Sequence, residues 1–401
     1  MIQVERHYIK GSDQILVLCQ SSKELYNRCN FLMRQAWINH QTLPDISKLI
    51  AETQPLECFK NLHNTKTAKQ TIRKCLTDWT NFKKALNAYK KDSSKFLGRP
   101  KPPHYKKRLA QVVFYNETIK GGQSGKLEKQ QSGMIIPTND CFSIESDRIY
   151  KQVVITPKTF GFIVDVSYEI SNVIPRKSKQ KSVACIDLGV NNLCAITSDK
   201  HSPILINGRI VKSINQYYNA NPCKSCSKKR YFRIENYFHH VSRYIIDNCV
   251  AYKIGTIIIG KNDGWKQNTK KEKRMRKKNR QEFQYIPFSK LIEKIVYKAE
   301  LAGVDVTFTE EAYTSQSSFL DRDSLPDYET GKKINPEFSG KRIKRGLYQS
   351  KEGVLINADC NGSANIGRKI IQNEQILLGL DRSVAATPVI VNPLKLSASV
   401  S

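Results

Sequence analysis

Residues 181–198, KSVACIDLGVNNLCAITS, hold the pattern that decides the fold of this chain. An apolar, β-prone run ends at Asp187, and Gly189 follows where the backbone must turn into a second apolar run, residues 193–197. The two runs predict a β-hairpin that presents one carboxylate at the end of a strand. Aspartate before glycine is also common in ordinary turns. Asp187 alone therefore does not establish a catalytic site.

A second acidic residue, Asp359, strengthens the case for a site. It lies in NADCNGSANIGRK, residues 357–369, whose spacing predicts a helix. One carboxylate at a strand end and another on a distant helix are what a two-metal nuclease site requires. Mg²⁺ is a hard cation that binds carboxylate oxygens and keeps open positions for phosphate and water.

The charge of the chain indicates a polyanionic partner. Its 401 residues include 66 Lys and Arg against 36 Asp and Glu, a formal net charge of +30. An excess of this size costs self-repulsion in the compact state, and the polar composition favours nucleic acid over membrane as the partner. The sequence has no run of 18 apolar residues and no signal-peptide pattern at its start, so we expect an intracellular protein that does not bind membranes.

The eleven cysteines are odd in number and scattered, which predicts reduced thiols in the core rather than a disulfide framework. Those in apolar runs are Cys19, Cys29, Cys185, Cys194 and Cys249.

The first half of the chain predicts a β domain with a helical unit inserted into it. Residues 13–97 carry apolar side chains at helical spacing, and the Pro-rich stretch 98–103 ends that pattern. Residues 1–12 and 98–178 contain short alternating runs that predict a small antiparallel barrel or sandwich.

The second half predicts an RNase H-like α/β domain. Its order is three strands, a helical stretch over 212–250, a buried strand at 255–259, a helix at 290–302, a strand at 304–309 and the helix of Asp359. The overall fold class is therefore α+β with several domains. Residues 371–401 show no clear periodicity, and we expect them to be poorly ordered.

Five segments in this order resemble the TnpB (OrfB) family of transposon-encoded, RNA-guided DNA endonucleases, which have a RuvC-like nuclease domain. The segments are FLGRPKPPHYK at 96–106, IDLGV at 186–190, FHHVS at 238–242, YTSQ at 313–316 and DCNGSANI at 359–366. The resemblance covers about residues 1–370, and in it Asp187 matches the first RuvC acid and Asp359 the third.

The resemblance implies a division of labour along the chain. Residues 1–12 and 98–178 would form a wedge-like nucleic-acid-binding barrel, 13–97 a helical recognition domain, and 181–311 with 356–370 the RuvC-like nuclease. Residues 312–355 would be an inserted segment that binds target nucleic acid. The implied partners are a guide RNA transcribed from the transposon, double-stranded DNA and two Mg²⁺ ions, in the cytoplasm of a bacterial or archaeal cell and acting at its nucleoid. A monomer is the simplest expectation, although the sequence does not decide whether one chain or two act.

The second RuvC acid departs from the family pattern. Most members end the equivalent of strand 256–259 with Glu, whereas this chain has Gly260. The next predicted strand ends at Glu310 and Glu311, and neighbouring parallel strands lie only about 4.8 Å apart. Because successive residues of a strand face opposite sides, only one of the two can point into the site. We favour Glu311, with Glu310 second, by resemblance to a branch that includes the eukaryotic Fanzor relatives. The alternative is a solvated Glu pair on a nuclease-inactive protein.

Zinc is a further departure, because many members carry two Cys-x-x-Cys pairs in the inserted segment and this chain has none there. We expect that segment to keep its shape through apolar side chains such as Phe319 and Tyr348. Cys223 and Cys226 form one Cys-x-x-Cys, but His239 and His240 lack the spacing of a zinc finger, so no structural zinc is expected.

Basic and aromatic residues give the candidate nucleic-acid contacts. The run at 270–280 also fits a nuclear-localisation signal, without other support, and nearby Trp265 fits equally a base-stacking residue or a core anchor. The candidate contacts are Arg73, Lys74, Arg99, Lys101, Tyr105, Lys106, Lys270, Lys271, Arg274, Arg276, Lys277, Lys278 and Arg280.

The leading interpretation is an RNA-guided DNA endonuclease that uses Asp187, Glu311 and Asp359. Two alternatives remain open at this point. One is a nuclease-inactive protein of the same fold that uses RNA to occupy DNA, which Gly260 favours. The other is a transposase that joins DNA strands by the same RNase H-like chemistry without a guide.

Overall fold

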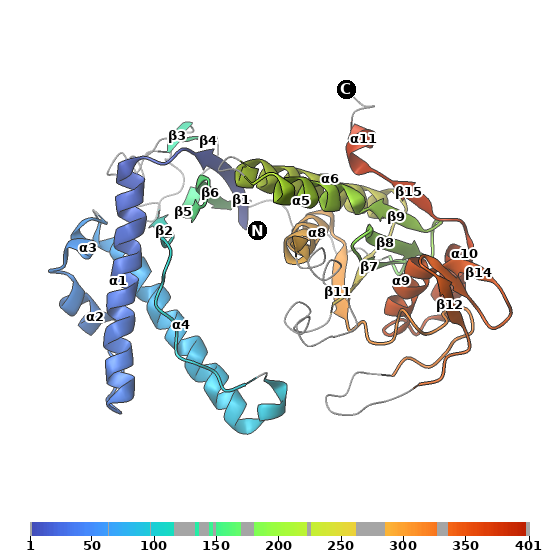
Figure 1. Ribbon diagram of the computed structural model, residues 1–401, viewed down its shortest axis with the longest axis horizontal. Coiled ribbons are helices and arrows are strands. Elements are labelled where there is room, and N and C mark those ends of the chain that lie inside the picture. Colours follow the sequence, from blue (N-terminus) through green and yellow to red (C-terminus); the bar gives the residue numbers. More distant parts are fainter. Residues whose placement is uncertain are drawn as a thin grey trace. The chain divides into compact units, whose positions relative to one another are not determined.

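The computed structural model describes residues 2–62, 64–96, 98–115, 133–135, 144–146, 150–169, 180–222, 226–261, 285–326 and 336–397. The chain divides into two compact units, residues 1–173 and 174–401 (Figure 1). No helix in these described ranges combines the length and the apolar character that crossing a membrane requires. The candidate contacts from Lys270 to Arg280, Trp265 and Cys223 lie outside the described residues.

The first unit combines long helices with an antiparallel sheet. The N-terminal strand joins this sheet by pairing with β6, as the sequence predicts. The described strands form an open sheet in the order β1-β6-β5-β2 and a separate β3–β4 pair, and they do not close into the predicted barrel. The elements are β1 (Ile2–Ile9), α1 (Asp13–Ile38), α2 (Ile46–Thr53), α3 (Glu57–Lys60), α4 (Thr65–Lys91), η1 (Ser93–Lys95), β2 (Val112–Tyr115), β3 (Gly133–Ile135), β4 (Ile144–Ser146), β5 (Tyr150–Lys158) and β6 (Gly161–Glu169).

Local signals in the sequence begin the two long helices of this unit. Ser12 caps α1 by accepting a hydrogen bond from the backbone of Ile15, and Asn64 caps α4 in the same way through Lys66. Between the helices, the ring of Trp37 on α1 packs edge-on to Phe82 on α4 at 5.4 Å between centroids. One hydrophobic core joins these helices to β2, β5 and β6.

The second unit is built on a six-stranded mixed sheet in the order β11-β10-β7-β8-β9-β15. The strands β7, β8 and β9 are antiparallel neighbours, whereas β10 and β11 are parallel to β7. Helix α8 connects β10 to β11, as a parallel crossover requires. The elements are β7 (Val183–Leu188), β8 (Asn192–Ser198), β9 (Ile204–Asn207), α5 (Arg209–Ala220), α6 (Cys226–Ala251), β10 (Thr256–Gly260), α8 (Phe288–Ala302), β11 (Asp305–Thr309), β12 (Lys341–Lys344), β13 (Leu347–Gln349), β14 (Leu355–Asn357), α9 (Ala358–Arg368), α10 (Glu374–Ala385), β15 (Val389–Val391) and α11 (Pro393–Ser397).

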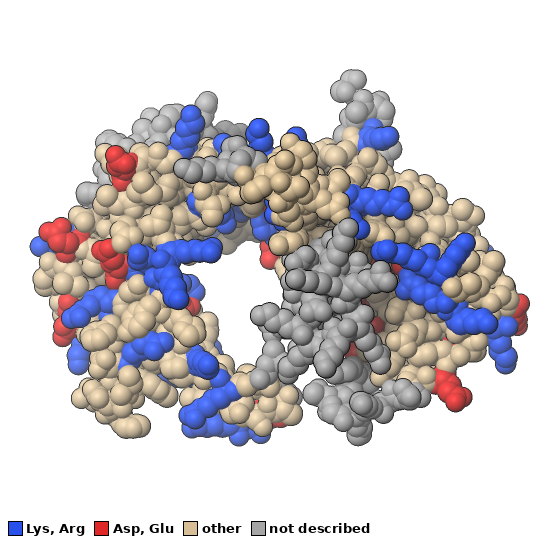
Figure 2. Space-filling model, viewed as in Figure 1, with Lys and Arg blue, Asp and Glu red and all other residues tan. Residues whose placement is uncertain are grey.

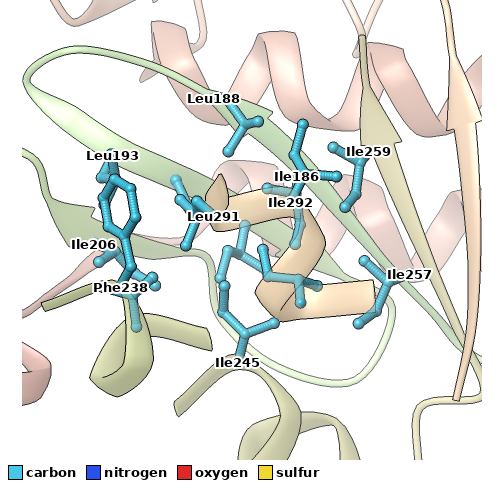
Figure 3. Packing of buried hydrophobic residues seen from close by; sticks show 14 of the residues in the cluster. Ile186, Leu188, Leu193, Ile206, Phe238, Ile245, Ile257, Ile259, Leu291 and Ile292 are labelled. Carbon is cyan, nitrogen blue, oxygen red and sulfur yellow. The ribbon is translucent and has the colours of Figure 1, made fainter. Parts of the chain in front are cut away.

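Helices cover both faces of this sheet. Alternate residues of β7 and β10, such as Ile186 and Ile257, pack against α6 and α8 in one core (Figure 3). The intervening residues Cys185 and Ile258 pack on the other face, with side chains of α9 and α10. Asp187 and Gly260 continue this second series, so strand alternation directs both positions to the α9 face.

The predicted strands and helices of this unit occur in the predicted order. The small sheet of β12, β13 and β14 between β11 and α9 was not predicted, and two further expectations differ from the structure. The stretch predicted as one helix over 212–250 is two helices, α5 and α6, on either side of Asn221 and Pro222. Proline disfavours helical geometry in the residue before it, which explains the break.

The expectation that residues 371–401 are poorly ordered is wrong for most of that range. Helix α10 buries Leu380 and Val384 completely, and β15 pairs in parallel with β9 at the edge of the sheet. The apolar residues Ile376, Leu377, Leu380 and Val384 do follow helical spacing, so the signal was present in the sequence.

The cysteine prediction is confirmed for the described part of the chain. The eight cysteines whose side chains the structure describes are all free, buried thiols. Within the inserted segment, Phe319 and Tyr348 are both fully buried, in the core that α9 and α10 share.

Candidate active site

The hairpin of β7 and β8 places Asp187 at one end of the sheet, beside α9. A Cβ atom at Gly362 of α9 would lie only 3.0 Å from Asp187 Oδ2. Glycine at this position therefore leaves room for the carboxylate between the strand and the helix. Ser363, next along α9, donates a 2.6 Å hydrogen bond to the carbonyl of Cys185, which fixes the helix on the strand that carries Asp187.

Glu311 fills the space beside Gly260. A Cβ atom at position 260 would lie 2.8 Å from Glu311 Oε1 and 2.7 Å from its Cγ, so no larger residue fits there unless Glu311 moves. Gly260 pairs with Thr309 in the β10–β11 register. Glu311 lies two residues after Thr309, so strand alternation directs it to the same face of the sheet as Thr309. Glu310 instead contacts Lys369, with 3.3 Å between Oε2 and Nζ. Of the two candidate glutamates, Glu311 is the one beside Gly260.

Asp359 lies in the first turn of α9, where the helix begins at the N-cap Asn357. Its Oδ2 accepts a 2.7 Å hydrogen bond from the side-chain amide of Asn192, at the start of β8. Its Oδ1 lies 3.3 Å from Arg342 Nη2, on the exposed strand β12. Segments far apart in the sequence thus hold this carboxylate.

The electrostatics of Asp187 and Glu311 reflect burial and crowding of like charges. Burial raises the pKa of Asp187 well above its ordinary value, and the negative charges of Glu311 and Asp359 raise it further, while Arg342 lowers it. Burial also raises the pKa of Glu311 to about 7. Three carboxylates that repel one another in a partly buried place are stabilised in the ionised form by a bound cation.

The donor set fits a hard divalent cation, because all three groups offer carboxylate oxygens. As the side chains lie, however, no group of three His, Cys, Asp or Glu residues in the described ranges closes around one point in the way a metal requires. Asn192 and Arg342 contact the two carboxylate oxygens of Asp359 in this arrangement.

The turn after Glu311 is held by two buried asparagines of α9. Asn365 donates to the carbonyls of Thr314 and Ser317, at 3.0 and 2.7 Å. Asn361 donates to the carbonyl of Ser317 and accepts from the backbone of Phe319, at 2.8 and 2.9 Å. Helix α9 therefore carries Asp359 and also fixes the chain segment that positions Glu311.

Sequence reasoning did not find four of these residues, Asn192, Arg342, Asn361 and Asn365. Asn361 and Asn365 are polar residues on the apolar face of a predicted helix, which is a usable signal for a buried hydrogen-bonding role. Asn192 and Arg342 carry no such signal, because only the tertiary fold brings them to Asp359.

The candidate nucleic-acid contacts of the first unit are distributed over α4 and the segment after it. Arg73 is exposed on α4, whereas Lys74 beside it donates a 2.6 Å hydrogen bond to Asp78. Arg99, Lys101 and Tyr105 are exposed, whereas Lys106 is half-buried.

Lys106 is not turned toward solvent, because its ammonium group lies over the ring of Tyr26, 4.4 Å from the centroid. In the second unit, the exposed imidazole of His239 lies 3.1 Å from Lys294 Nζ.

Comparison with known proteins identifies a local and a global likeness. Residues 288–366 match the family model described as "Cas12f1-like, TNB domain". This range includes α8, both candidate glutamates, β12 to β14 and Asp359, but not Asp187. No curated protein matches the chain.

Among solved structures, the cryo-EM structure of a Cas12f1–sgRNA–target DNA complex matches with a TM-score of 0.50 and 12% sequence identity, over 88% of this chain and 82% of that one. A CRISPR-Cas12f ternary complex matches over 90% of this chain and 82% of that one, at 12% identity and a TM-score of 0.34. The first match shows a shared multidomain α+β fold. The chain is therefore similar to Cas12f1 in its fold and, over residues 288–366, to the Cas12f1-like TNB domain in its sequence.

Proposed function

We propose that this chain is a transposon-encoded, RNA-guided DNA endonuclease of the TnpB and Cas12f kind. The observation that carries the proposal is that Glu311 fills the space beside Gly260. This place lies at the end of the sheet where the charges of Glu311 and Asp359 act on Asp187. The net charge of +30 fits nucleic-acid partners. The matched Cas12f1 structure is a complex with sgRNA and target DNA, which agrees with a guide RNA and a DNA target here.

Asp187, Glu311 and Asp359 would hold two Mg²⁺ ions, which when bound supply a nucleophilic water at neutral pH and stabilise the leaving oxygen of a phosphodiester. The other residues position these carboxylates. Gly260 and Gly362 leave room for Glu311 and Asp187, and Asn192 orients Asp359. Arg342 places a permanent positive charge next to Asp359, where it can bind the phosphate that is cut. Base pairing with the guide would supply target sequence, while the protein reads a short flanking motif.

The test is cleavage of a matched DNA duplex by the protein purified with its guide RNA, in Mg²⁺. Asp187→Ala, Glu311→Gln and Asp359→Ala should each abolish cutting. Glu310→Gln is the matched control, because the neighbouring glutamate contacts Lys369 instead, and it should keep cutting. Cutting that survives in Asp187→Ala would remove the site assignment.

A nuclease-inactive protein that uses its guide RNA to occupy DNA is the second candidate. Gly260 favours it, because this position lacks the side chain that most TnpB proteins use. It predicts that the complex of protein and guide binds a matched duplex tightly and leaves it intact in both Mg²⁺ and Mn²⁺.

A further inference from the structure

The segment that follows α4 has an unusual support. Residues 99–108, RPKPPHYKKR, form neither helix nor strand and contain three prolines, which cannot donate a backbone hydrogen bond. We call this segment the basic ridge. Because this segment belongs to no helix or sheet, its backbone N–H and C=O groups need hydrogen-bond partners from elsewhere, such as side chains.

Side chains of α1 bind the backbone of the basic ridge. Asn27 forms a reciprocal pair with Lys106, donating to its carbonyl at 3.0 Å and accepting from its N–H at 2.7 Å. Asn30 donates to the carbonyl of Pro103 at 3.0 Å, and Arg34 donates to the same carbonyl at 2.6 Å. Asn30 is itself fully buried and accepts a 2.8 Å hydrogen bond from the indole of Trp79 on α4. The ridge is thus fixed to the helical core on its inner side.

The outer side of the basic ridge is cationic and aromatic. Lys101, Tyr105, Lys107 and Arg108 are exposed, and the segment contains no acidic residue. Among the described residues, no carboxylate forms an ion pair with either lysine or with Arg108. The ring of Tyr105 is 45% exposed while the guanidinium of Arg34 lies 5.1 Å from its centroid, which holds the ring in place without covering it.

The geometry points to a preformed site on the basic ridge for a single-stranded nucleic acid, in which Lys101, Lys107 and Arg108 bind phosphates and Tyr105 stacks on an unpaired base. Lys107 lies six residues after Lys101, a span of at most about 21 Å. At a rise of about 3.4 Å per nucleotide, that span covers at most about six stacked nucleotides. An exposed, immobilised tyrosine between cations is suited to stacking with a base, which requires that the base be unpaired.

This inference deepens the proposed function, because it assigns single-strand binding to a place outside the nuclease unit. It also assigns Asn27, Asn30 and Arg34 as positioning residues, and it removes Lys106 from the contacts, since its ammonium group is held over Tyr26. Pre-ordering the ridge lowers the entropy cost of binding.

The experiment measures binding by fluorescence anisotropy, with the full chain and three labelled probes of one sequence: single-stranded RNA, single-stranded DNA and duplex DNA. The combined variant Lys101→Ala, Lys107→Ala, Arg108→Ala should weaken single-strand binding. It should also reduce the slope of log K against log salt by about 2, as three lost phosphate contacts predict. The control combines Lys10→Ala, Lys48→Ala and Lys60→Ala, three exposed lysines outside the ridge that remove the same charge. Equal losses in the two triple variants would reduce the effect to net charge and overturn the proposal.

Two further variants separate stacking and positioning from charge. Tyr105→Leu should weaken binding of both single strands by about fivefold or more and leave duplex binding unchanged. Asn27→Leu should weaken single-strand binding although it removes no charge, because Asn27 holds the backbone of the ridge at Lys106. Its melting temperature is measured as well, to show that the variant is folded. Unchanged single-strand binding in either variant would contradict the site. A preference between the RNA and DNA probes would identify which strand the ridge serves.

These binding assays need no cleavage, so they can fail while the nuclease proposal stands, and the reverse also holds.

Discussion

Gly260 and Glu311 form a complementary pair at the scale of single residues. The Glu311 side chain lies where any side chain at position 260 would have to begin, at 2.7 to 2.8 Å from the Cβ position. The register of β10 and β11 explains how an acid at position 311 can take the place of one at position 260. Gly260 pairs with Thr309, and Glu311 is only two residues further along the chain. A carboxylate can therefore reach this place from either strand, but not from both at once.

This complementarity predicts the outcome of moving the acid back. Glu311→Ala should lower DNA cleavage by more than about 100-fold, the upper range for removing even an outer partner of a metal site. Gly260→Glu added to Glu311→Ala should restore part of the activity, because the space beside position 260 is then vacant apart from the flexible end of Ile366. Gly260→Glu alone should destabilise the protein by about 1–3 kcal/mol through overpacking. Guide-dependent cleavage and thermal unfolding of the three variants measure this, and a double variant that folds yet cuts no better than Glu311→Ala would contradict it.

At the scale of elements, α9 is the part on which the site depends most. Its small residues Gly362 and Ser363 let it lie against β7, its first turn carries Asp359, and its asparagines hold the turn after Glu311. Asn365 is fully buried, and both hydrogens of its amide are used. Replacing it leaves buried carbonyl groups without their donor.

Asn365→Leu should therefore lower the free energy of unfolding by about 1–3 kcal/mol, the usual cost of leaving a buried polar group unsatisfied. Cleavage at a temperature where the variant is folded should fall further than stability explains, because the turn that positions Glu311 is loosened. Asn236→Leu on α6, an exposed asparagine in a helix, is the control and should change neither. Chemical denaturation and cleavage rates test the pair. Loss of stability with full cleavage would mean that α9 supports the fold without positioning Glu311.

The packing of α6 against α8 predicts a pH dependence of stability. Burial is the main cause that lowers the pKa of Lys298 from 10.5 to about 8; the charges of Lys294 and Arg243 act in the same direction, and Asp247 opposes them. The folded state thus binds fewer protons than the unfolded state between about pH 8 and 10.5, so this residue makes the free energy of unfolding rise with pH in that window.

Between about pH 8 and 10.5, we expect the free energy of unfolding of wild type to rise by about 1–2 kcal/mol more than that of Lys298→Met, after allowance for partial solvent screening. Lys229→Met, an exposed lysine on α6, is the control and should follow wild type. Urea unfolding at a series of pH values measures the difference. Parallel curves for wild type and Lys298→Met would show that Lys298 keeps its ordinary affinity for protons.

Sequence patterns predicted most elements of unit 174–401 because alternation and helical spacing are local. Asp187, the strand of Gly260 and the helix of Asp359 were found in this way, and the Glu310–Glu311 choice followed from alternation together with the resemblance. Asn192 and Arg342 could not be found, because their contacts with Asp359 depend on how strands from distant segments meet. Helix α10 was missed although the helical spacing of Ile376, Leu380 and Val384 is present in the sequence.

For the whole molecule, the carboxylates of the candidate site fall in one unit, whereas candidate cationic contacts occur in both. The three carboxylates of the candidate site belong to unit 174–401, whereas α4 and the basic ridge belong to unit 1–173. Lys and Arg side chains outnumber acidic ones on the face drawn in Figure 2, in agreement with the net charge of +30. In the proposed function, binding to a polyanion would depend on many dispersed cations, and cutting would depend on a few carboxylates.

This separation predicts that Glu311→Gln loses cleavage and keeps its affinity for nucleic acid. Removing one negative charge from a chain of +30 changes the long-range attraction little, and no phosphate contact is lost, so the dissociation constant for single-stranded RNA should stay within about twofold. The slope of log K against log salt should also be unchanged, because the slope counts the cations that contact phosphate. Anisotropy titrations at several KCl concentrations, beside cleavage of a matched duplex, measure both properties on one protein preparation. A tenfold loss of RNA affinity would mean that the carboxylate site also supports guide binding, and that the two units do not act separately.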